Sequence, residues 1–167
     1  LLAGVLTSAQ HVGHADAKSS VKGKITFTSQ YCGGARPPQE LIDRLSTPRA
    51  YANYPLYIKT GTTNVLDATP VASVTTNEQG EFQLNLPPGQ YVVVDAQRKD
   101  RIYYDELLNT HSEATDHYSA VDTLCLKKWA EKPLFSFTVE QEDLVLAPLN
   151  IHQGCPWDVN PCLTFQG

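Results

Sequence analysis

Apolar and polar residues alternate at every second position in the first patterned segment of the chain. In residues 21–29, Val21, Ile25 and Phe27 fall on one side of the pattern and Lys24 on the other. A period of two is that of a β-strand with one buried face. Short segments of similar character, bounded by turn residues, predict further strands over residues 54–60, 71–76, 81–86, 134–139 and 144–151.

Two of these strands are separated by the turn sequence Asn-Glu-Gln-Gly at residues 77–80. This turn predicts a hairpin between residues 71–76 and residues 81–86. After a Pro-Pro-Gly turn, residues 90–95 are apolar on both faces. A strand buried on both sides has that composition, so we expect this segment at the centre of a sheet.

Helical spacing replaces the strand pattern in two places. Residues 39–45 follow two prolines and carry leucine and isoleucine on one helical face, which predicts a short helix. Residues 96–133 interrupt the strands, and within them a capping-box sequence beginning at Ser119 precedes apolar residues at helical spacing. We therefore expect a helical insertion here, with a helix over residues 119–131 that carries Cys125 on its apolar face.

Length and composition indicate one globular domain. The chain has 167 residues, of which 41% are hydrophobic and 19% charged, an ordinary balance for a single packed core. We expect one mainly β sandwich over residues 21–167. Residues 1–20 begin with an apolar stretch followed by small residues, which is typical either of an N-terminal arm or of the remnant of a signal peptide.

A resemblance to a known family supports the sandwich. The sequence TTNEQGEFQLNLPPGQYVVV, residues 75–94, resembles the central hairpin and turn of carboxypeptidase regulatory-like domains, and GKIT, residues 23–26, resembles their first strand. These domains are prealbumin-like (transthyretin-like, Ig-like) antiparallel β-sandwiches and include the Cna-B repeats of surface proteins. The resemblance covers about the middle half of the chain. It implies a fold rather than an activity, because such sandwiches serve as stalks, ligand binders and occasional enzymes.

Some Cna-B domains form an internal amide bond between a lysine and an asparagine or aspartate, promoted by a buried acid. The resemblance places Asp95 near the position of the acid and Asn150 at that of the acceptor. The lysines of the matching first strand, Lys22 and Lys24, fall on the polar side of the alternation. The chain departs from the family pattern at this point, so we do not expect the crosslink.

Charge and hydropathy exclude two classes of partner. The net charge is -5 and there is no run of lysines or arginines, so the chain lacks the basic surface that binds nucleic acid. No apolar stretch is long enough for a membrane-spanning helix.

The four cysteines, Cys32, Cys125, Cys155 and Cys162, contain no C-x-x-C pair. Their even number fits two disulfides in any of three connectivities. The short spacing between Cys155 and Cys162 suggests a local loop, which would leave Cys32 with Cys125. Disulfides would indicate an oxidising compartment, that is, a secreted, periplasmic or cell-envelope protein. Four free thiols in a cytosolic protein are the alternative.

Candidate binding residues are few. His111, His117 and His152 supply imidazoles for a divalent metal site, although a polar, solvated loop explains the first two equally well. Arg36, between a diglycine and two prolines, and Trp157, between the last two cysteines, are candidate contacts for a protein or carbohydrate ligand. We find no nucleophile elbow and no phosphate-binding loop.

These observations favour a non-catalytic β-sandwich module outside the cytoplasm, which binds an unidentified protein or carbohydrate or gives structural support, and which needs no cofactor. The alternative is a small metal-binding protein or metalloenzyme on the same sandwich, with zinc, copper or iron.

Overall fold

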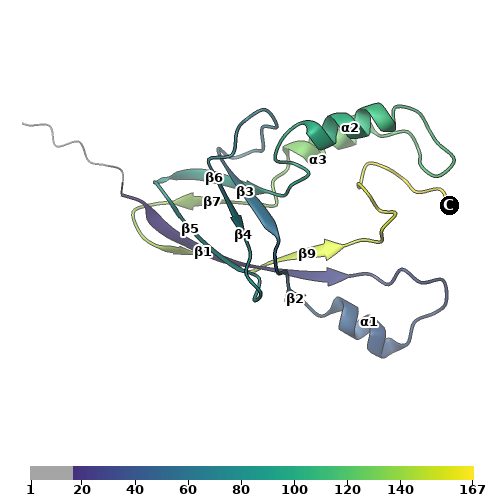
Figure 1. Cartoon of the computed structure of the whole chain (residues 1–167), viewed down its shortest axis with the longest axis horizontal. Helices are drawn as coiled ribbons and strands as arrows, with labels where there is room; N and C mark the ends of the chain where they lie inside the picture. The colour runs from purple at the N-terminus through teal and green to yellow at the C-terminus, as the bar shows by residue number, and fades with distance from the viewer. Residues whose placement is uncertain (1–16) are drawn as a thin grey trace, which may run out of the picture.

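The computed structural model describes residues 17–167, which form two β-sheets with a helical layer beside them (Figure 1). The first sheet is built on β1, which pairs with four other strands: β1 (Ser19–Ser29), β2 (Arg49–Ala50), β5 (Glu81–Leu86), β8 (Leu144–Val145) and β9 (Leu149–Gln153). The second sheet has the order β4-β3-β6-β7: β3 (Pro55–Thr60), β4 (Ala72–Thr75), β6 (Gly89–Val94) and β7 (Phe135–Val139). The predicted β-sandwich is confirmed. The first sheet is mixed rather than antiparallel, because β8 and β9 both pair parallel to β1.

The strand β1 changes partners halfway along its length. Its first half pairs with β5 and β8, so that Val21 lies opposite both Leu84 and Leu144. Its second half pairs with β9 and β2, where Ile25 lies opposite Leu149. As a result β1 and β9 run side by side and leave the sandwich at the same end (Figure 1). This arrangement brings the loop after β1 close to the tail after β9.

The core lies between the sheets and follows the predicted alternation. Nine buried residues form it, contributed by β1, β3, β5, β6 and β7: Val21, Ile25, Leu56, Ile58, Phe82, Leu86, Tyr91, Val93 and Val139. Side chains that alternate into the space between two sheets make such a core. The strand β6 lies between β3 and β7, and Val92 and Val94 on its other face are also fully buried. The prediction of a central strand that is apolar on both faces is therefore confirmed.

The predicted hairpin between residues 71–76 and 81–86 is wrong. The two strands form where expected, but β4 pairs with β3 in one sheet and β5 pairs with β1 in the other. The turn between them extends the pairing of β5 with β1: the Ile25 amide of β1 donates to the Gly80 carbonyl at 2.8 Å. Gly80 has a φ of +75°, the left-handed region that glycine adopts at low cost. The turn at residues 77–80 was predicted correctly, but the strands before and after it belong to different sheets.

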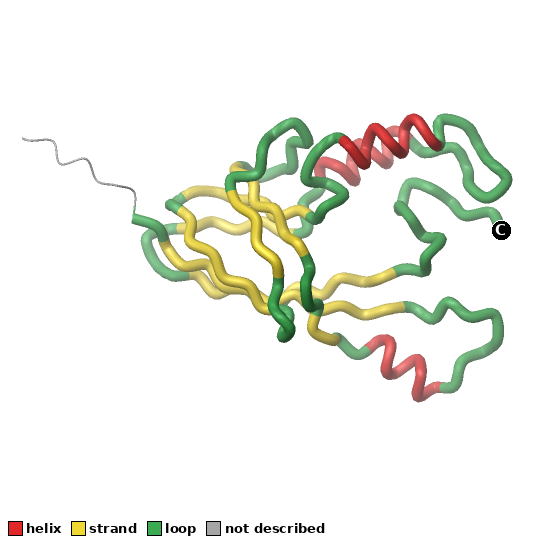
Figure 2. Tube along the Cα trace, in the orientation of Figure 1, coloured by secondary structure: helices red, strands yellow, loops and turns green. Residues whose placement is uncertain are grey.

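Residues 17–167 form three helices, and the two in the insertion lie together, apart from the helix that follows β1 (Figure 2). They are α2 (Ile102–Thr110) and α3 (Thr123–Glu131), and α1 (Gln39–Ser46) follows β1 as predicted. The helix α3 begins four residues later than the predicted residue 119, because the cap is Asp122, whose carboxylate accepts from the Cys125 amide at 2.9 Å. The helix α2 was not predicted separately within the insertion.

Buried polar groups attach this helical layer to the sandwich. Asn64, which is 2% exposed, donates from its side-chain amide to the carbonyls of Arg98 and Ala130, at 2.8 and 2.7 Å. Arg98 forms an ion pair with Asp95 at 2.6 Å and also donates to the Lys132 carbonyl. The loop after β3, the turn after β6 and the end of α3 are thus held together by hydrogen bonds.

A second, smaller core lies under the helices. It consists of Leu107, Val121, Leu126, Cys162 and Leu163, with tyrosine side chains and Trp129 packed against it. Because Cys162 and Leu163 come from the tail, this core joins the two helices to the end of the described chain. None of the helices within residues 17–167 is long and apolar enough to cross a membrane.

Two disulfides are formed, but not in the predicted pairs. Cys32 is joined to Cys155 and Cys125 to Cys162, at sequence separations of 123 and 37 residues. The predicted Cys155–Cys162 loop and Cys32–Cys125 bridge are wrong. The reason is the parallel pairing of β1 and β9, which delivers Cys32 and Cys155 to the same place, while the tail then turns back toward α3.

Two other sequence expectations have a different outcome. The single strand predicted over residues 144–151 is two strands, β8 and β9, separated at residues 146–148, where a proline lies. Of the N-terminal arm or signal remnant predicted over residues 1–20, residues 1–16 lie outside the described part of the chain, and Ser19 and Ser20 belong to β1. The predicted single domain over residues 21–167 stays an expectation.

Candidate functional site

The tail that follows β9 carries a group of aromatic side chains. We name this group the aromatic cluster and define it by its rings: His111, His117, Tyr118, Trp157 and Phe165. Phe165 is at its centre, with ring centroids 5.5 Å from Tyr118, 6.0 Å from Trp157 and 6.4 Å from His117. His111 contacts the edge of Tyr118, with centroids 5.4 Å apart. Two segments distant in sequence, the loop after α2 and the tail, therefore form one surface.

The backbone around the cluster is held in place by phenol and amide hydrogen bonds. The Tyr118 hydroxyl donates to the Trp157 carbonyl at 3.0 Å, and the Tyr103 hydroxyl donates to the Val159 carbonyl at 2.7 Å. Burial raises the pKa of Tyr103, so this donor stays protonated. Tyr118 and Phe165 also form an isolated β-bridge.

Both disulfides anchor the tail that contributes Trp157 and Phe165. Cys155 lies two residues before Trp157, and Cys162 lies three residues before Phe165. The Asp158 carboxylate accepts from the Cys155 amide at 2.9 Å and from the Gln30 side chain at 2.8 Å. The segment is thus attached to the end of β1 on one side and to α3 on the other.

Part of the cluster is open to solvent. Trp157 and Phe165 are each 39% exposed, as is the neighbouring Val159. Large aromatic side chains that stay exposed next to one another often mark interaction surfaces on soluble proteins. The cluster offers apolar ring faces beside neutral hydrogen-bonding groups, and such a surface can bind a ligand without catalysing a reaction.

The structure brings together three of the predicted site residues. Trp157, His111 and His117 all belong to the aromatic cluster. His152 lies on β9 instead, where it pairs with Thr28 of β1, with Oγ1 and Nδ1 3.4 Å apart. Across residues 17–167, no three histidine, cysteine, aspartate or glutamate side chains gather as metal ligands would. The three predicted metal ligands therefore do not share a site.

Arg36 lies apart from this surface in the sequence, in the exposed loop between β1 and α1. Within the part of the chain that the structure describes, it takes part in none of the salt bridges, which involve Arg98, Lys99 and Arg101. Its role as a ligand contact stays a prediction.

The positions that the family resemblance implied for a crosslink hold other interactions. Asn150 of β9 lies between two threonines of β1: its side-chain oxygen accepts from Thr26 at 3.1 Å and its amide donates to Thr28 at 3.0 Å. Asp95 is paired with Arg98. Threonines occupy the place beside Asn150 where a crosslink would need a lysine.

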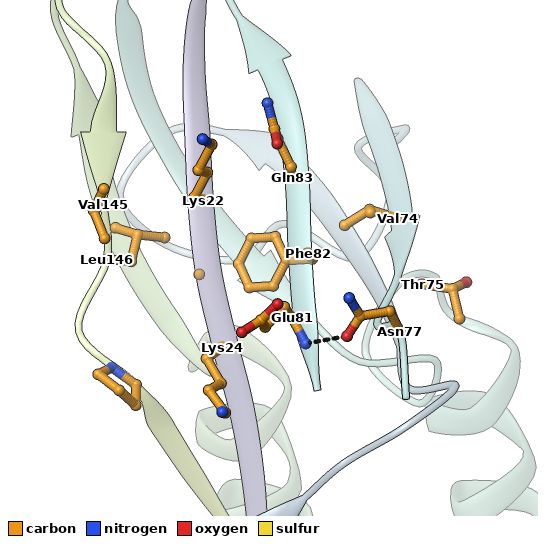
Figure 3. A pocket seen from close by; sticks show the side chains of 12 residues that line it. Lys22, Lys24, Val74, Thr75, Asn77, Glu81, Phe82, Gln83, Val145 and Leu146 are labelled. Atoms are coloured by element: carbon orange, nitrogen blue, oxygen red, sulfur yellow. Dashed lines mark hydrogen bonds between the residues drawn. The ribbon is translucent and has the colours of Figure 1, made fainter. Parts of the chain in front are cut away.

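A concave surface outside the aromatic cluster lies across β1, β5 and the segment after β8 (Figure 3). It is an open groove of about 750 Å³ whose lining combines the Lys22 and Lys24 side chains with Phe82, Val145 and Leu146. Figure 3 also shows Glu81, whose amide donates to the Asn77 side chain at 2.8 Å. The groove contains no catalytic constellation.

Sequence reasoning missed Phe165 as a member of the site. Phe165 and Tyr118 are 47 positions apart in the sequence, and only the return of the tail to the loop after α2 brings them into contact. The sequence singled out Trp157, which lies between two cysteines, and the histidines His111 and His117.

Comparisons with known proteins give weak likenesses. No protein-family model matches the chain, and no curated protein matches it. Among solved structures it is similar to the Bacillus anthracis TIE protein, with a TM-score of 0.38 and 13% identity over 81% of this chain and 17% of that one. It is also similar to the shaft pilin SpaA of Lactobacillus rhamnosus GG, with a TM-score of 0.35 and 10% identity over 82% of this chain and 50% of that one. A mutant of this pilin gives a TM-score of 0.41 and 12% identity over 82% and 51%.

The chain spans about half the length of the pilin and 17% of the TIE protein. At such scores the likeness carries no functional argument. The β-sandwich is established by the chain's own strand pairing.

Proposed function

We propose that this chain is a non-catalytic β-sandwich module of the carboxypeptidase regulatory-like type that works outside the cytoplasm, secreted, periplasmic or attached to the cell envelope, in binding or structural support. The observation that carries the proposal is the pairing of all four cysteines in two disulfides. Disulfides form and persist in oxidising compartments and are rare in the cytosol.

The position of the two bonds supports a structural purpose. Each joins the tail to a different part of the molecule, one to the loop after β1 and one to α3. A bond between residues far apart in sequence restricts the unfolded chain strongly, and a protein exposed outside the cell gains from this restriction. The tail reaches from the sandwich to the helices, so it connects the two cores in addition to the hydrogen bonds of Asn64 and Arg98.

The experiment compares the chain after export to the periplasm of a bacterial host with the chain made in a reducing cytosol. We expect peptide mapping of the exported protein without reduction to give both bonds, and thermal unfolding to shift to lower temperature when a reductant is added. Four alkylatable thiols in the exported protein, with a melting temperature that does not respond to reductant, would contradict the proposal.

A further inference from the structure

The aromatic cluster presents three nearly parallel rings. The plane of Phe165 is inclined by 27° to that of His117 and by 29° to that of Trp157. Their centroids are 6.0 to 6.4 Å apart, which is the spacing of offset rings rather than of a close face-to-face stack. Phe165 is therefore stacked, with an offset, beside both His117 and Trp157.

Hydrogen bonds and disulfides hold the segments that carry the aromatic cluster. The phenols of Tyr118 and Tyr103 hold the backbone beside Trp157, and the Gln166 amide donates to the His117 carbonyl at 2.8 Å. Two disulfides fix the same segment. A surface that is already ordered loses little conformational entropy on binding, so even a small contact area gives measurable affinity.

The size of the exposed area favours a small ligand over a protein. An aromatic side chain has about 150–250 Å² of surface in total, so 39% exposure leaves roughly 60–100 Å² on each of Trp157 and Phe165. A stable protein interface covers about 800 Å² on each partner. The cluster by itself suits a ligand of a few rings.

The charge around the cluster disfavours an anionic ligand. Asp116 precedes His117 and Asp158 follows Trp157, both side chains are exposed, and the whole chain carries a net charge of -5. An anionic ligand would be repelled here. Thr164 and Gln166, which flank Phe165 in sequence and are exposed, supply neutral hydrogen-bonding groups.

We propose that the aromatic cluster binds a neutral, β-linked glycan by stacking pyranose rings on Phe165 and Trp157. A pyranose with equatorial hydroxyls presents flat faces of C–H groups, and these carry the partial positive charge that the face of an aromatic ring attracts. Its hydroxyls then reach the polar groups at the edge of the cluster. This inference rests on the proposed function, because it places the module among extracellular polysaccharides.

The test measures binding of cellohexaose and chitohexaose to the disulfide-bonded chain by calorimetry and by tryptophan fluorescence. We expect at least one of them to bind, and Trp157→Ala and Phe165→Ala each to weaken that binding by about tenfold, the equivalent of 1.4 kcal/mol. Trp157→Phe keeps a ring and should retain most of the affinity. Val145→Ala, at a position on β8 that is 76% exposed and outside the cluster, is the matched control and should bind like the wild type.

Three results would overturn the glycan proposal. They are absence of binding by both hexasaccharides at millimolar concentration, binding that is unchanged in both alanine variants, and a dimer in sedimentation that Trp157→Ala converts to a monomer. The disulfides are mapped first on the same sample. Free thiols would count against the proposed function, whereas intact disulfides without glycan binding would count against the glycan site alone.

Discussion

A single missing side chain determines how β1 packs against β5. Gly23 lies opposite Phe82, and the Phe82 ring lies directly over it. A Cβ atom at Gly23 would be 2.5 Å from Cζ of that ring, which is much closer than any real contact. Phe82 is 7% exposed and belongs to the core, so the ring has little room to move.

We therefore expect Gly23→Ala to lower the free energy of unfolding by about 1–3 kcal/mol, the usual cost of overpacking a core. Gly34→Ala is the control, because a Cβ there would meet no atom within 4 Å. Urea denaturation of both variants measures the difference. Equal stability of the two variants would show that the Phe82 ring does not occupy this position.

Lys59 is a buried cation in the layer between the sandwich and the helices. The residue is 1% exposed, and its ammonium group donates to the Val65 carbonyl at 2.7 Å. Burial lowers the pKa of Lys59 from its ordinary 10.5, and the negative charges of Asp100 and Asp67 oppose this only in part. Between the lowered pKa and 10.5, the unfolded chain binds more protons than the folded one, so stability contributed by this group rises with pH.

The comparison of the wild type with Lys59→Met isolates this effect. The free energy of unfolding of the wild type minus that of Lys59→Met should increase as the pH rises toward 10.5, the ordinary pKa of lysine. Lys22→Met is the matched control, since it makes the same exchange of side chains at an exposed position of β1. A flat difference for Lys59→Met would mean that the ammonium group is solvated in the folded protein.

At the scale of elements, the join between the helical layer and the sandwich depends on Asn64. Its side-chain amide donates to two carbonyls that belong to different segments, Arg98 after β6 and Ala130 in α3. Asn64→Ala would leave both carbonyls buried without this partner, and each such loss is costly. We expect a decrease of roughly 2–3 kcal/mol in the free energy of unfolding.

Asn109→Ala on the exposed side of α2 is the control for Asn64→Ala and should change stability by less than about 0.5 kcal/mol. Asn64→Asp keeps the shape of the side chain but loses both donors, so it should be destabilising as well. Denaturation in urea, monitored by circular dichroism, gives all three values. A stable Asn64→Asp variant would show that shape rather than hydrogen bonding attaches the loop.

Elements could be predicted from the sequence where the signal is local. The alternation around Val21 and Ile25 and the double-sided apolar run of β6 located their strands to within about two residues. The partner strands of β4 and β5 could not be predicted. A turn sequence indicates that the chain bends, but not whether the strands before and after the bend belong to the same sheet. The start of α3 was misplaced because Ser119 and Asp122 are both good caps, and only the bond from the Cys125 amide distinguishes them.

At the scale of the whole molecule, the tail after β9 brings together cysteines and aromatic residues that are far apart in the sequence. The pairs of cysteines and the members of the aromatic cluster both depend on β9 lying parallel to β1 and on the tail then returning to α3. Spacing along the chain carries no information about either. Trp157 could be proposed as a contact only because of its neighbours, whereas Phe165 needed the structure.

The two disulfides should stabilise different parts of the molecule against unfolding. In the chain-entropy model, the bond across 123 residues contributes about 5 kcal/mol and the bond across 37 residues about 4 kcal/mol. We expect Cys32→Ser with Cys155→Ser to be the more destabilising pair in thermal unfolding. Hydrogen exchange should then rise chiefly in the loop between β1 and α1 and at the start of the tail.

The second pair of substitutions, Cys125→Ser with Cys162→Ser, should destabilise the smaller core. Cys162 and Leu163 pack there with Leu126, so release of the tail should raise hydrogen exchange in α2 and α3 while β1 and β6 stay protected. The reason is that the sandwich core contains none of these residues. Uniform loss of protection in both pairs of variants would show instead that the two cores unfold as one cooperative unit.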